Sequence, residues 1–251
     1  MDFGPRRARA ADGDVPAVVA ADAQRSGAGP IRAEPVVSAR EEVLARLRSA
    51  RDAGAPRGGV PPVPRDHRRT GELAPGSVEV LDRLTETLTD YRATVHRVAD
   101  EDGVSAAIAA VLEDAGATTF VAPPGLPARW LAEVTARVRP DEPSLSVPEL
   151  DGVDAVVTGA AVAIAETGTF VLDASSPDQG RRAISLVPDH HLCVIRAADV
   201  VSSVPEGIAR LDPAHPLTFV SGPSATSDIE LDRVEGVHGP RRLDVVLVGP
   251  S

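Results

Sequence analysis

The chain has 251 residues and a net charge of −11, with 43% hydrophobic and only 2% aromatic residues. An acidic chain repels phosphate backbones and anionic lipid surfaces, and few aromatic side chains are present to stack on bases, which argues against nucleic-acid and membrane partners. All 26 basic residues are arginine, which excludes Schiff-base lysines and the P-loop lysine.

The first predicted segments precede the main body of the chain. Residues 1–36 are rich in Ala, Asp, Gly, Pro and Arg without sustained periodicity, which predicts a disordered N-terminal extension. Ser38 and Glu41 have the spacing of a capping box, and Pro and Gly dominate residues 54–76. We therefore expect residues 37–76 to form a helix followed by an extended arm. The sequence shows no secretory signal and no membrane span, so we expect a cytoplasmic protein.

The remaining residues alternate between patterns typical of strands and of helices, which predicts an open α/β sheet. Helices are predicted over residues 78–89, 103–114, 127–138, 180–187 and 204–211. Strands are predicted over residues 94–98, 118–122, 153–158, 191–195, 218–220 and 243–248, with a hairpin over 164–172. The only cysteine, Cys193, lies in an apolar run. We expect it to be a buried strand thiol, and one cysteine excludes an intrachain disulfide and a four-cysteine iron–sulfur site.

The predicted hairpin carries the first candidate site, at its tip. Glu166 lies between apolar strands, and Gly168 permits the positive φ angle of a tight turn. A carboxylate held in this way suits a general base or a nucleophile. We expect Thr167, Gly168 and Thr169 to contact the substrate. The alternative is a hairpin tip whose glutamate is solvated.

The segment Gly180–Ala183 supplies the second candidate. Arg181 has the chemistry to bind a substrate carboxylate through two hydrogen bonds. The alternative is a surface ion pair at the start of a helix. His190 and His191 follow shortly after, and we expect them at the edge of a strand rather than as metal ligands. The spacing of His and Cys residues indicates no structural metal site.

The third candidate is the hydroxyl-rich loop from Ser221 to Asp228, directly after a short apolar strand. Ligands of open α/β sheets bind beyond the carboxyl ends of the strands, so we expect this loop to line the site. We expect the carboxylate of Asp228 to orient a hydroxyl group or a histidine. The other candidate contacts are Gly222, Pro223, Ser224 and Thr226. A capped turn is the alternative interpretation.

The fourth candidate is His238, which has Gly236 and Gly239 on either side. A histidine titrates near neutral pH, so His238 suits proton transfer, and Gly239 allows close approach of the backbone to a ligand. The alternative is a β-turn histidine that hydrogen-bonds the backbone.

These segments in this order, at residues 165–169, 180–183, 221–228 and 236–240, resemble the LUD-domain family, in particular its lactate-utilisation protein C type. The resemblance covers roughly residues 38–249. It implies a LUD domain over residues 77–251. It also implies the fold shared by ribose-phosphate isomerases, glucosamine-phosphate isomerases and CoA transferases, together with a helical N-terminal part.

The resemblance further implies a component of a system that oxidises L-lactate to pyruvate. The chain would be a small-carboxylate-binding or accessory subunit of an L-lactate-oxidising dehydrogenase complex, acting with iron–sulfur partner proteins. We expect no cofactor in this chain, because it has neither the cysteines for a cluster nor a G-x-G-x-x-G fingerprint. We expect Glu166, Asp228 and His238 to be catalytic and to face one pocket. The alternatives are an independent acyl- or CoA-transferase-like or isomerase-like enzyme on the same fold, and a non-catalytic assembly subunit.

Overall fold

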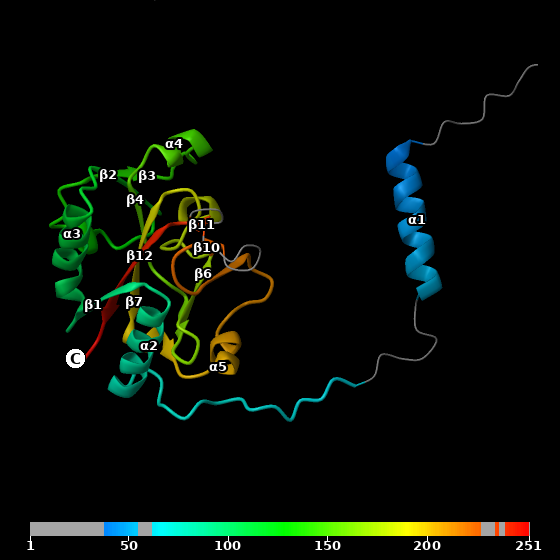
Figure 1. The fold of residues 1–251 in the computed structure, drawn as a ribbon, viewed down its shortest axis with the longest axis horizontal. Coiled ribbons are helices and arrows are strands. Elements are labelled where there is room, and N and C mark those ends of the chain that lie inside the picture. Colours follow the sequence, from blue (N-terminus) through cyan, green and yellow to red (C-terminus); the bar gives the residue numbers. More distant parts are fainter. Residues whose placement is uncertain (1–37, 55–61, 227–233, 236–238, 251) are drawn as a thin grey trace, which may run out of the picture. The chain divides into compact units, whose positions relative to one another are not determined.

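The computed structural model describes residues 38–54, 62–226, 234–235 and 239–250 (Figure 1). The predicted N-terminal extension therefore lies outside the described residues. Contacts divide the chain into two compact units, with the boundary in the sequence between Val63 and Pro64. None of the helices in the described part is both long and apolar enough to cross a bilayer.

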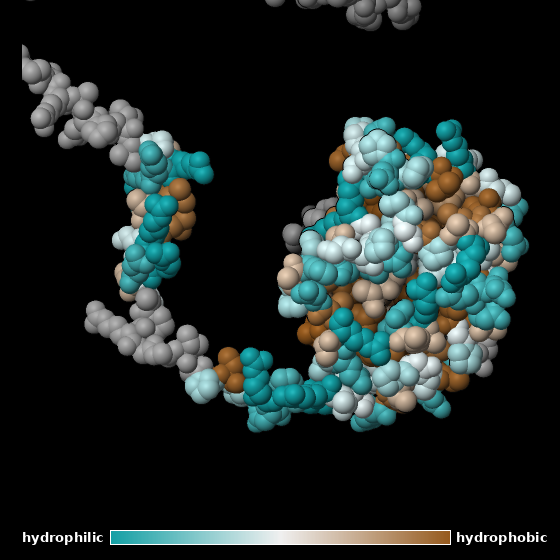
Figure 2. Space-filling view, turned by 180° about the vertical axis from the view of Figure 1, so that it is seen from behind, coloured by the Kyte–Doolittle hydropathy of each residue, from teal (hydrophilic) through white to brown (hydrophobic). Residues whose placement is uncertain are grey.

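The first unit contains the helix α1 (Ala39–Gly54). Its start confirms the predicted capping box, because the Glu41 N–H donates to Ser38 Oγ at 3.3 Å and the Ser38 N–H donates to the Glu41 carboxylate at 2.9 Å. Every described side chain of this helix is exposed or partly exposed, including apolar Val43 and Leu47. Figure 2 shows such hydrophobic side chains among the hydrophilic ones along the helix.

The second unit is built on a sheet of six parallel strands, which confirms the predicted open α/β architecture. In spatial order the strands are β1 (Thr94–Val98), β12 (Arg242–Val248), β7 (His190–Arg196), β4 (Ala155–Thr158), β2 (Thr119–Ala122) and β3 (Arg137–Pro140). The inner strands β12, β7, β4 and β2 are largely buried, as expected for a parallel sheet that is covered on both sides.

One face of this sheet packs against α3 (Val104–Asp114) and the buried Trp130. The other face packs against α2 (Val78–Asp90) and a second, four-stranded sheet, which places the central sheet between two layers (Figure 1). The second sheet has the order β8 (Val200–Val201), β5 (Val162–Ile164), β6 (Thr169–Asp173) and β9 (Leu217–Val220). Cys193 lies buried between the layers, as predicted.

Smaller elements complete the second unit. The helix α5 (Val204–Ala209) begins with a capping box formed by Ser203 and Glu206. The remaining α-helix and strands of the described part are α4 (Val147–Asp151), β10 (Ala225–Thr226) and β11 (Val234–Glu235), the two strands forming an antiparallel pair.

Two predicted helices are wrong. Residues 127–138 form only a 3₁₀ turn, Ala128–Leu131, and the chain then enters β3. The backbone of β2 has a free edge there, and β3 satisfies it by parallel pairing, so tertiary hydrogen bonding overrides a weak local helical pattern. The helix predicted over 180–187 is likewise only a 3₁₀ turn, Arg182–Ser185.

The start of the second unit matches the predicted arm only in part. Residues 62–70 contain no helix or strand and are exposed. Further along, Leu73 packs against the core between the layers, and its N–H donates to Ser202 Oγ at 3.5 Å. The described part of the arm therefore has no regular secondary structure at residues 62–70 and packs on the core at Leu73. The predicted domain limits, 37–76 and 77–251, stay predictions.

Candidate functional site

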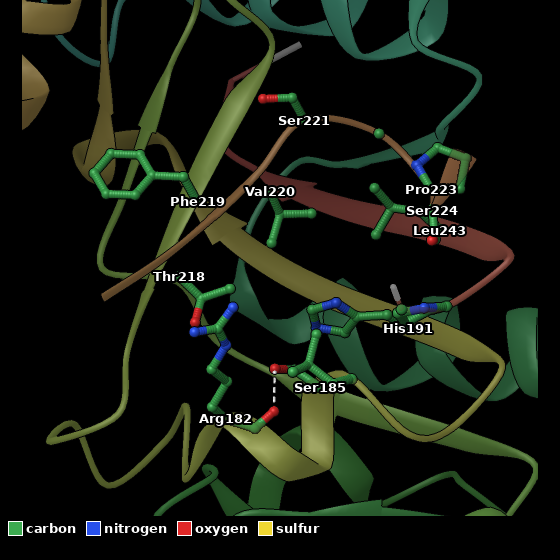
Figure 3. Close-up of a pocket in the computed structure, with 14 residues that line it drawn as sticks. Arg182, Ser185, His191, Thr218, Phe219, Val220, Ser221, Pro223, Ser224 and Leu243 are labelled. Carbon is green, nitrogen blue, oxygen red and sulfur yellow. Dashed lines mark hydrogen bonds between the residues drawn. The ribbon is translucent and has the colours of Figure 1, made fainter. Parts of the chain in front are cut away.

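The candidate site is a pocket with a volume of about 190 Å³ on the second unit (Figure 3). It lies where the loop after β9 approaches the first residues of β7 and β12. Its lining residues are Arg182, Ser185, Leu186, His191, Thr218, Phe219, Val220, Ser221, Gly222, Pro223, Ser224, Gly239, Pro240 and Leu243.

The location differs from the one expected from the sequence. The strand before the hydroxyl-rich loop, β9, belongs to the second sheet and pairs antiparallel with β6. The pocket therefore lies beside the amino ends of the central strands, not beyond their carboxyl ends. The rule for open parallel sheets does not apply, because the second sheet covers this face and creates its own crevice.

Backbone geometry brings the loop into place. Gly222 has a φ angle of +83°, and a Cβ there would lie 2.6 Å from the carbonyl oxygen of Tyr91. Only glycine therefore lets the loop pass the end of α2. Next, the Ser224 N–H donates to the Pro240 carbonyl at 2.7 Å. This bond joins the loop to Gly239 and Pro240, so four predicted contacts, Gly222, Pro223, Ser224 and Gly239, line one pocket.

His191 forms part of the pocket wall although only 1% of its surface is exposed. Its Nε2 lies 2.8 Å from Thr158 Oγ1, and its ring meets Phe170 edge-on with centroids 5.8 Å apart. Burial, and then the nearby charge of His190, lowers the pKa of His191 to about 3. The imidazole is therefore neutral at physiological pH.

Arg182 supplies the positive charge of the pocket. Its carbonyl oxygen accepts a hydrogen bond from Ser185 Oγ at 3.1 Å, while its exposed guanidinium has no partner among the described residues. Figure 3 shows this side chain extending from its 3₁₀ turn toward Thr218, along the wall of the pocket. A guanidinium without an internal partner is available to bind an anion.

Arg181, the residue predicted to bind substrate, does not line this pocket. Its Nε and Nη2 bind the Asp141 carboxylate at 2.6 and 2.8 Å, and Nη2 also donates to the Leu145 carbonyl at 2.6 Å. Burial raises the pKa of Asp141, but the hydrogen bonds from Arg181 and Leu145 lower it by more. The guanidinium of Arg181 is thus held by the protein itself.

Glu166 also lies outside the pocket, in a separate hollow. Its carboxylate forms an ion pair with Arg68 at 2.7 Å and accepts a hydrogen bond from the Val204 N–H at 3.2 Å. This hollow is lined by Arg68, Glu72, Leu73, Arg83, Glu166 and Ser202. The described structure therefore does not bring Glu166 together with Ser224.

Hydroxyl groups nevertheless connect the hairpin tip to the pocket. Thr167 Oγ1 donates to Thr169 Oγ1 at 2.8 Å, and Thr169 Oγ1 lies 2.7 Å from the Oγ of Ser221, which lines the pocket. Gly168 turns the tip with a φ angle of +60°. The predicted contacts Thr167 to Thr169 thus support a wall of the pocket.

The other predicted residues are described only in part. Asp228 and His238 lie outside the described residues, and Thr226 is described only through its backbone in β10. The expected convergence of Glu166, Asp228 and His238 in one pocket stays a prediction.

Four polar pocket residues were not predicted from the sequence: Arg182, Ser185, His191 and Thr218. One signal was present for His191, because a histidine beside the apolar run Leu192–Ile195 must either find a partner or lie at a cavity.

A buried ionic cluster fixes the strands beneath the pocket. The carboxylate of Asp244 is fully buried and bonds with His96 Nε2 at 2.7 Å, His190 Nε2 at 2.8 Å and Arg242 Nε at 2.8 Å. Burial raises the pKa of Asp244, but these hydrogen bonds lower it by more, to well below its usual value. Because side chains alternate along a strand, Asp244 faces away from the pocket while Leu243 faces it.

The described residues contain no cluster of three or more His, Cys, Asp or Glu that would hold a metal ion. The polar chemistry of the pocket therefore comes from its arginine, imidazole, hydroxyl and backbone groups.

Comparisons with known proteins agree with one another. The family model described as the LUD domain matches residues 81–248. Lactate utilization protein C of Deinococcus radiodurans is 50% identical over 175 residues, which cover 68% of this chain and 80% of that protein. Lactate utilization protein C of Bacillus subtilis is 31% identical over 116 residues, 43% of this chain and 48% of that protein.

A solved structure extends the comparison to the fold. The crystal structure of a DUF162 family protein from Deinococcus radiodurans has a TM-score of 0.60 and 43% sequence identity, and the match covers 71% of this chain and all of that one. The family match spans more than half of the sequence, including the central sheet, the second sheet and all of the pocket residues. This chain belongs to the LUD-domain family, within its lactate utilization protein C type.

Proposed function

We propose that this protein is a small-carboxylate-binding subunit of a system that oxidises L-lactate to pyruvate. Iron–sulfur partner proteins would carry the electrons, and this chain would hold no cofactor of its own. The proposal is supported by the names of several relatives, lactate utilization protein C, and by the chemistry of the pocket.

The observation that carries the proposal is the guanidinium of Arg182, which lies beside a small pocket and has no partner within the described part of the chain. A guanidinium binds a carboxylate through two parallel hydrogen bonds, which orients as well as attracts the anion. Apolar Leu186, Val220 and Leu243 line the same pocket and suit a short alkyl group. In this proposal Arg182 takes the role that the sequence suggested for Arg181, because Arg181 already binds Asp141.

Asp228 and His238 remain the proposed proton-transfer groups, and Glu166 would join them only after its ion pair with Arg68 opens, because it lies in a separate hollow. The ribose-phosphate isomerase-like fold remains part of the proposal. The alternative of an acyl-transferring enzyme requires a free carboxylate as nucleophile. The ion pair between Glu166 and Arg68 weighs against it, because a paired carboxylate is a poorer nucleophile. The assembly-subunit alternative requires no ligand in the pocket.

Titration calorimetry of the purified protein with L-lactate tests the proposal. We expect Arg182→Gln to weaken binding about tenfold or more, because a charge-assisted hydrogen-bond pair is lost. The matched control is Arg137→Gln, which changes an exposed arginine at the sheet edge and should leave the affinity unchanged. Equal affinities in Arg182→Gln and wild type, or no binding of lactate by the wild type, would contradict a carboxylate site here.

A further inference from the structure

Two ionisable side chains line the described pocket, Arg182 and His191, and they differ in kind. The exposed guanidinium is a fixed positive charge at the surface. The imidazole is buried and neutral, since the pKa of His191 lies at about 3. The described lining contains no carboxylate. One positive charge suits a ligand with one negative charge.

Among the described residues, one ring nitrogen of His191 has a hydrogen-bond partner and the other has none. Nε2 bonds with Thr158 Oγ1 at 2.8 Å inside the core, whereas Nδ1 has no hydrogen-bond partner among the described residues. A buried polar atom without a partner is costly, unless a water molecule or a ligand satisfies it. Figure 3 shows the ring extending from β7 into the space between Ser185 and Val220.

The contact with Phe170 and the bond to Thr158 hold the ring in one orientation. Two hydroxyls of the pocket are already engaged, because Ser185 Oγ donates to the Arg182 carbonyl and Ser221 Oγ bonds with Thr169 Oγ1. His191 therefore offers a pre-oriented hydrogen-bonding group to a ligand whose anionic end lies at Arg182.

We propose that Arg182 binds the carboxylate of a monocarboxylate while Nδ1 of His191 recognises an oxygen on its second carbon, so that the pocket selects 2-hydroxy acids over unsubstituted acids. This inference rests on the proposed function, because it adds a second ligand contact to the carboxylate site proposed there. A hydroxyl both donates and accepts, so it pairs with Nδ1 in either tautomer of the imidazole. His191 acts here as a specificity-determining residue.

The test compares L-lactate with propionate, which lacks only the hydroxyl, by calorimetry on the full chain. We expect the wild type to bind L-lactate about three- to tenfold more tightly than propionate, the range for one neutral hydrogen bond. Equal affinities for the two acids would overturn the inference and leave the carboxylate site intact. Binding of neither acid would instead remove the proposed function, and the inference with it.

Two substitutions of His191 distinguish the role of Nδ1 from that of Nε2. In His191→Gln the side-chain amide reaches the place of Nε2 and keeps the contact with Thr158, but nothing replaces Nδ1. In His191→Asn the amide lies near the place of Nδ1. We expect the preference for lactate to vanish in His191→Gln and to persist in His191→Asn.

Thermal unfolding shows whether each variant is folded, and His215→Gln, at an exposed histidine paired with Asp173, is the control that should change neither affinity. A lactate preference retained by folded His191→Gln would overturn the proposal. If His191→Gln does not fold, the wild-type comparison and folded His191→Asn still decide the outcome.

Discussion

At the scale of single residues, Asp244 shows how strongly three strands depend on one carboxylate. It has no exposed surface, and its donors come from β1, β7 and β12 itself. Removing one partner of a buried ionic cluster leaves the other charges and donors uncompensated. We expect Asp244→Asn to lower the free energy of unfolding at pH 7 by about 3–5 kcal/mol, measured by urea denaturation.

The surface pair of Asp189 and Arg241 provides the contrast at the same scale, because both side chains are more than half exposed. Asp189→Asn should cost less than about 1 kcal/mol. A loss in Asp244→Asn as small as in Asp189→Asn would show that the buried cluster contributes little to stability.

The same carboxylate predicts a dependence of stability on pH. The pKa of Asp244 is lower in the folded than in the unfolded protein, so its charge stabilises the fold above its unfolded pKa of about 3.9. That contribution is lost as the pH falls from there toward the folded pKa. Urea denaturation from pH 7 down to pH 3 checks this. The difference in the free energy of unfolding between wild type and Asp244→Asn should become smaller only below about pH 4. A difference in the free energy of unfolding that stays constant from pH 7 to pH 3 would contradict a lowered pKa of Asp244 in the folded protein.

At the scale of elements, the hairpin between β5 and β6 depends on one glycine. Gly168 has a φ angle of +60°, and a Cβ there would lie 2.9 Å from the backbone of Thr87 in α2. Thr87 Oγ1 also donates to the Ala165 carbonyl at 2.9 Å, so the hairpin tip is packed closely on this helix. Backbone cannot yield to a new methyl group as a flexible side chain does.

A matched pair of substitutions, at Gly168 and Gly116, measures how much the close packing of the hairpin on α2 contributes to stability. Gly116 follows α3 with a φ angle of +65°, yet nothing lies within 4 Å of a Cβ placed there. Gly116→Ala therefore introduces only left-handed strain, about 1–2 kcal/mol. Gly168→Ala introduces the same strain and a clash, so denaturant unfolding should show about 1–3 kcal/mol of further loss. Equal losses in the two variants would mean that the hairpin can move away from α2.

At the scale of the whole molecule, the second unit contains both sheets and the pocket. Residues 1–36 have little apolar content to bury. We expect their removal to change the free energy of unfolding by less than about 1 kcal/mol, the typical effect of one point mutation. Leu73→Ala is the comparison, because Leu73 packs on the core and its truncation should cost more than that. A loss of more than about 1 kcal/mol on truncation would show that the extension packs against the folded protein.

The sequence by itself determined much of this protein. Local patterns predicted α2, α3, α5 and most strands, because an apolar stripe or an apolar run must be buried whatever its partner is. The capping box at Ser38 and the turn at Gly168 follow from local chemistry in the same way. The ordered motifs were also enough to identify the LUD-domain family, which the comparisons confirm.

Only the tertiary structure decided the site. Neighbouring Arg181 and Arg182 are chemically identical, and the position of Asp141 determines that it is the guanidinium of Arg181 that is bound within the described structure. His191 became a pocket residue because the second sheet covers one face of the central sheet and leaves a crevice beside β7. The strand β3 formed because β2 offered a free edge. Each of these outcomes depends on groups far apart in sequence, whose meeting no local pattern of side chains specifies.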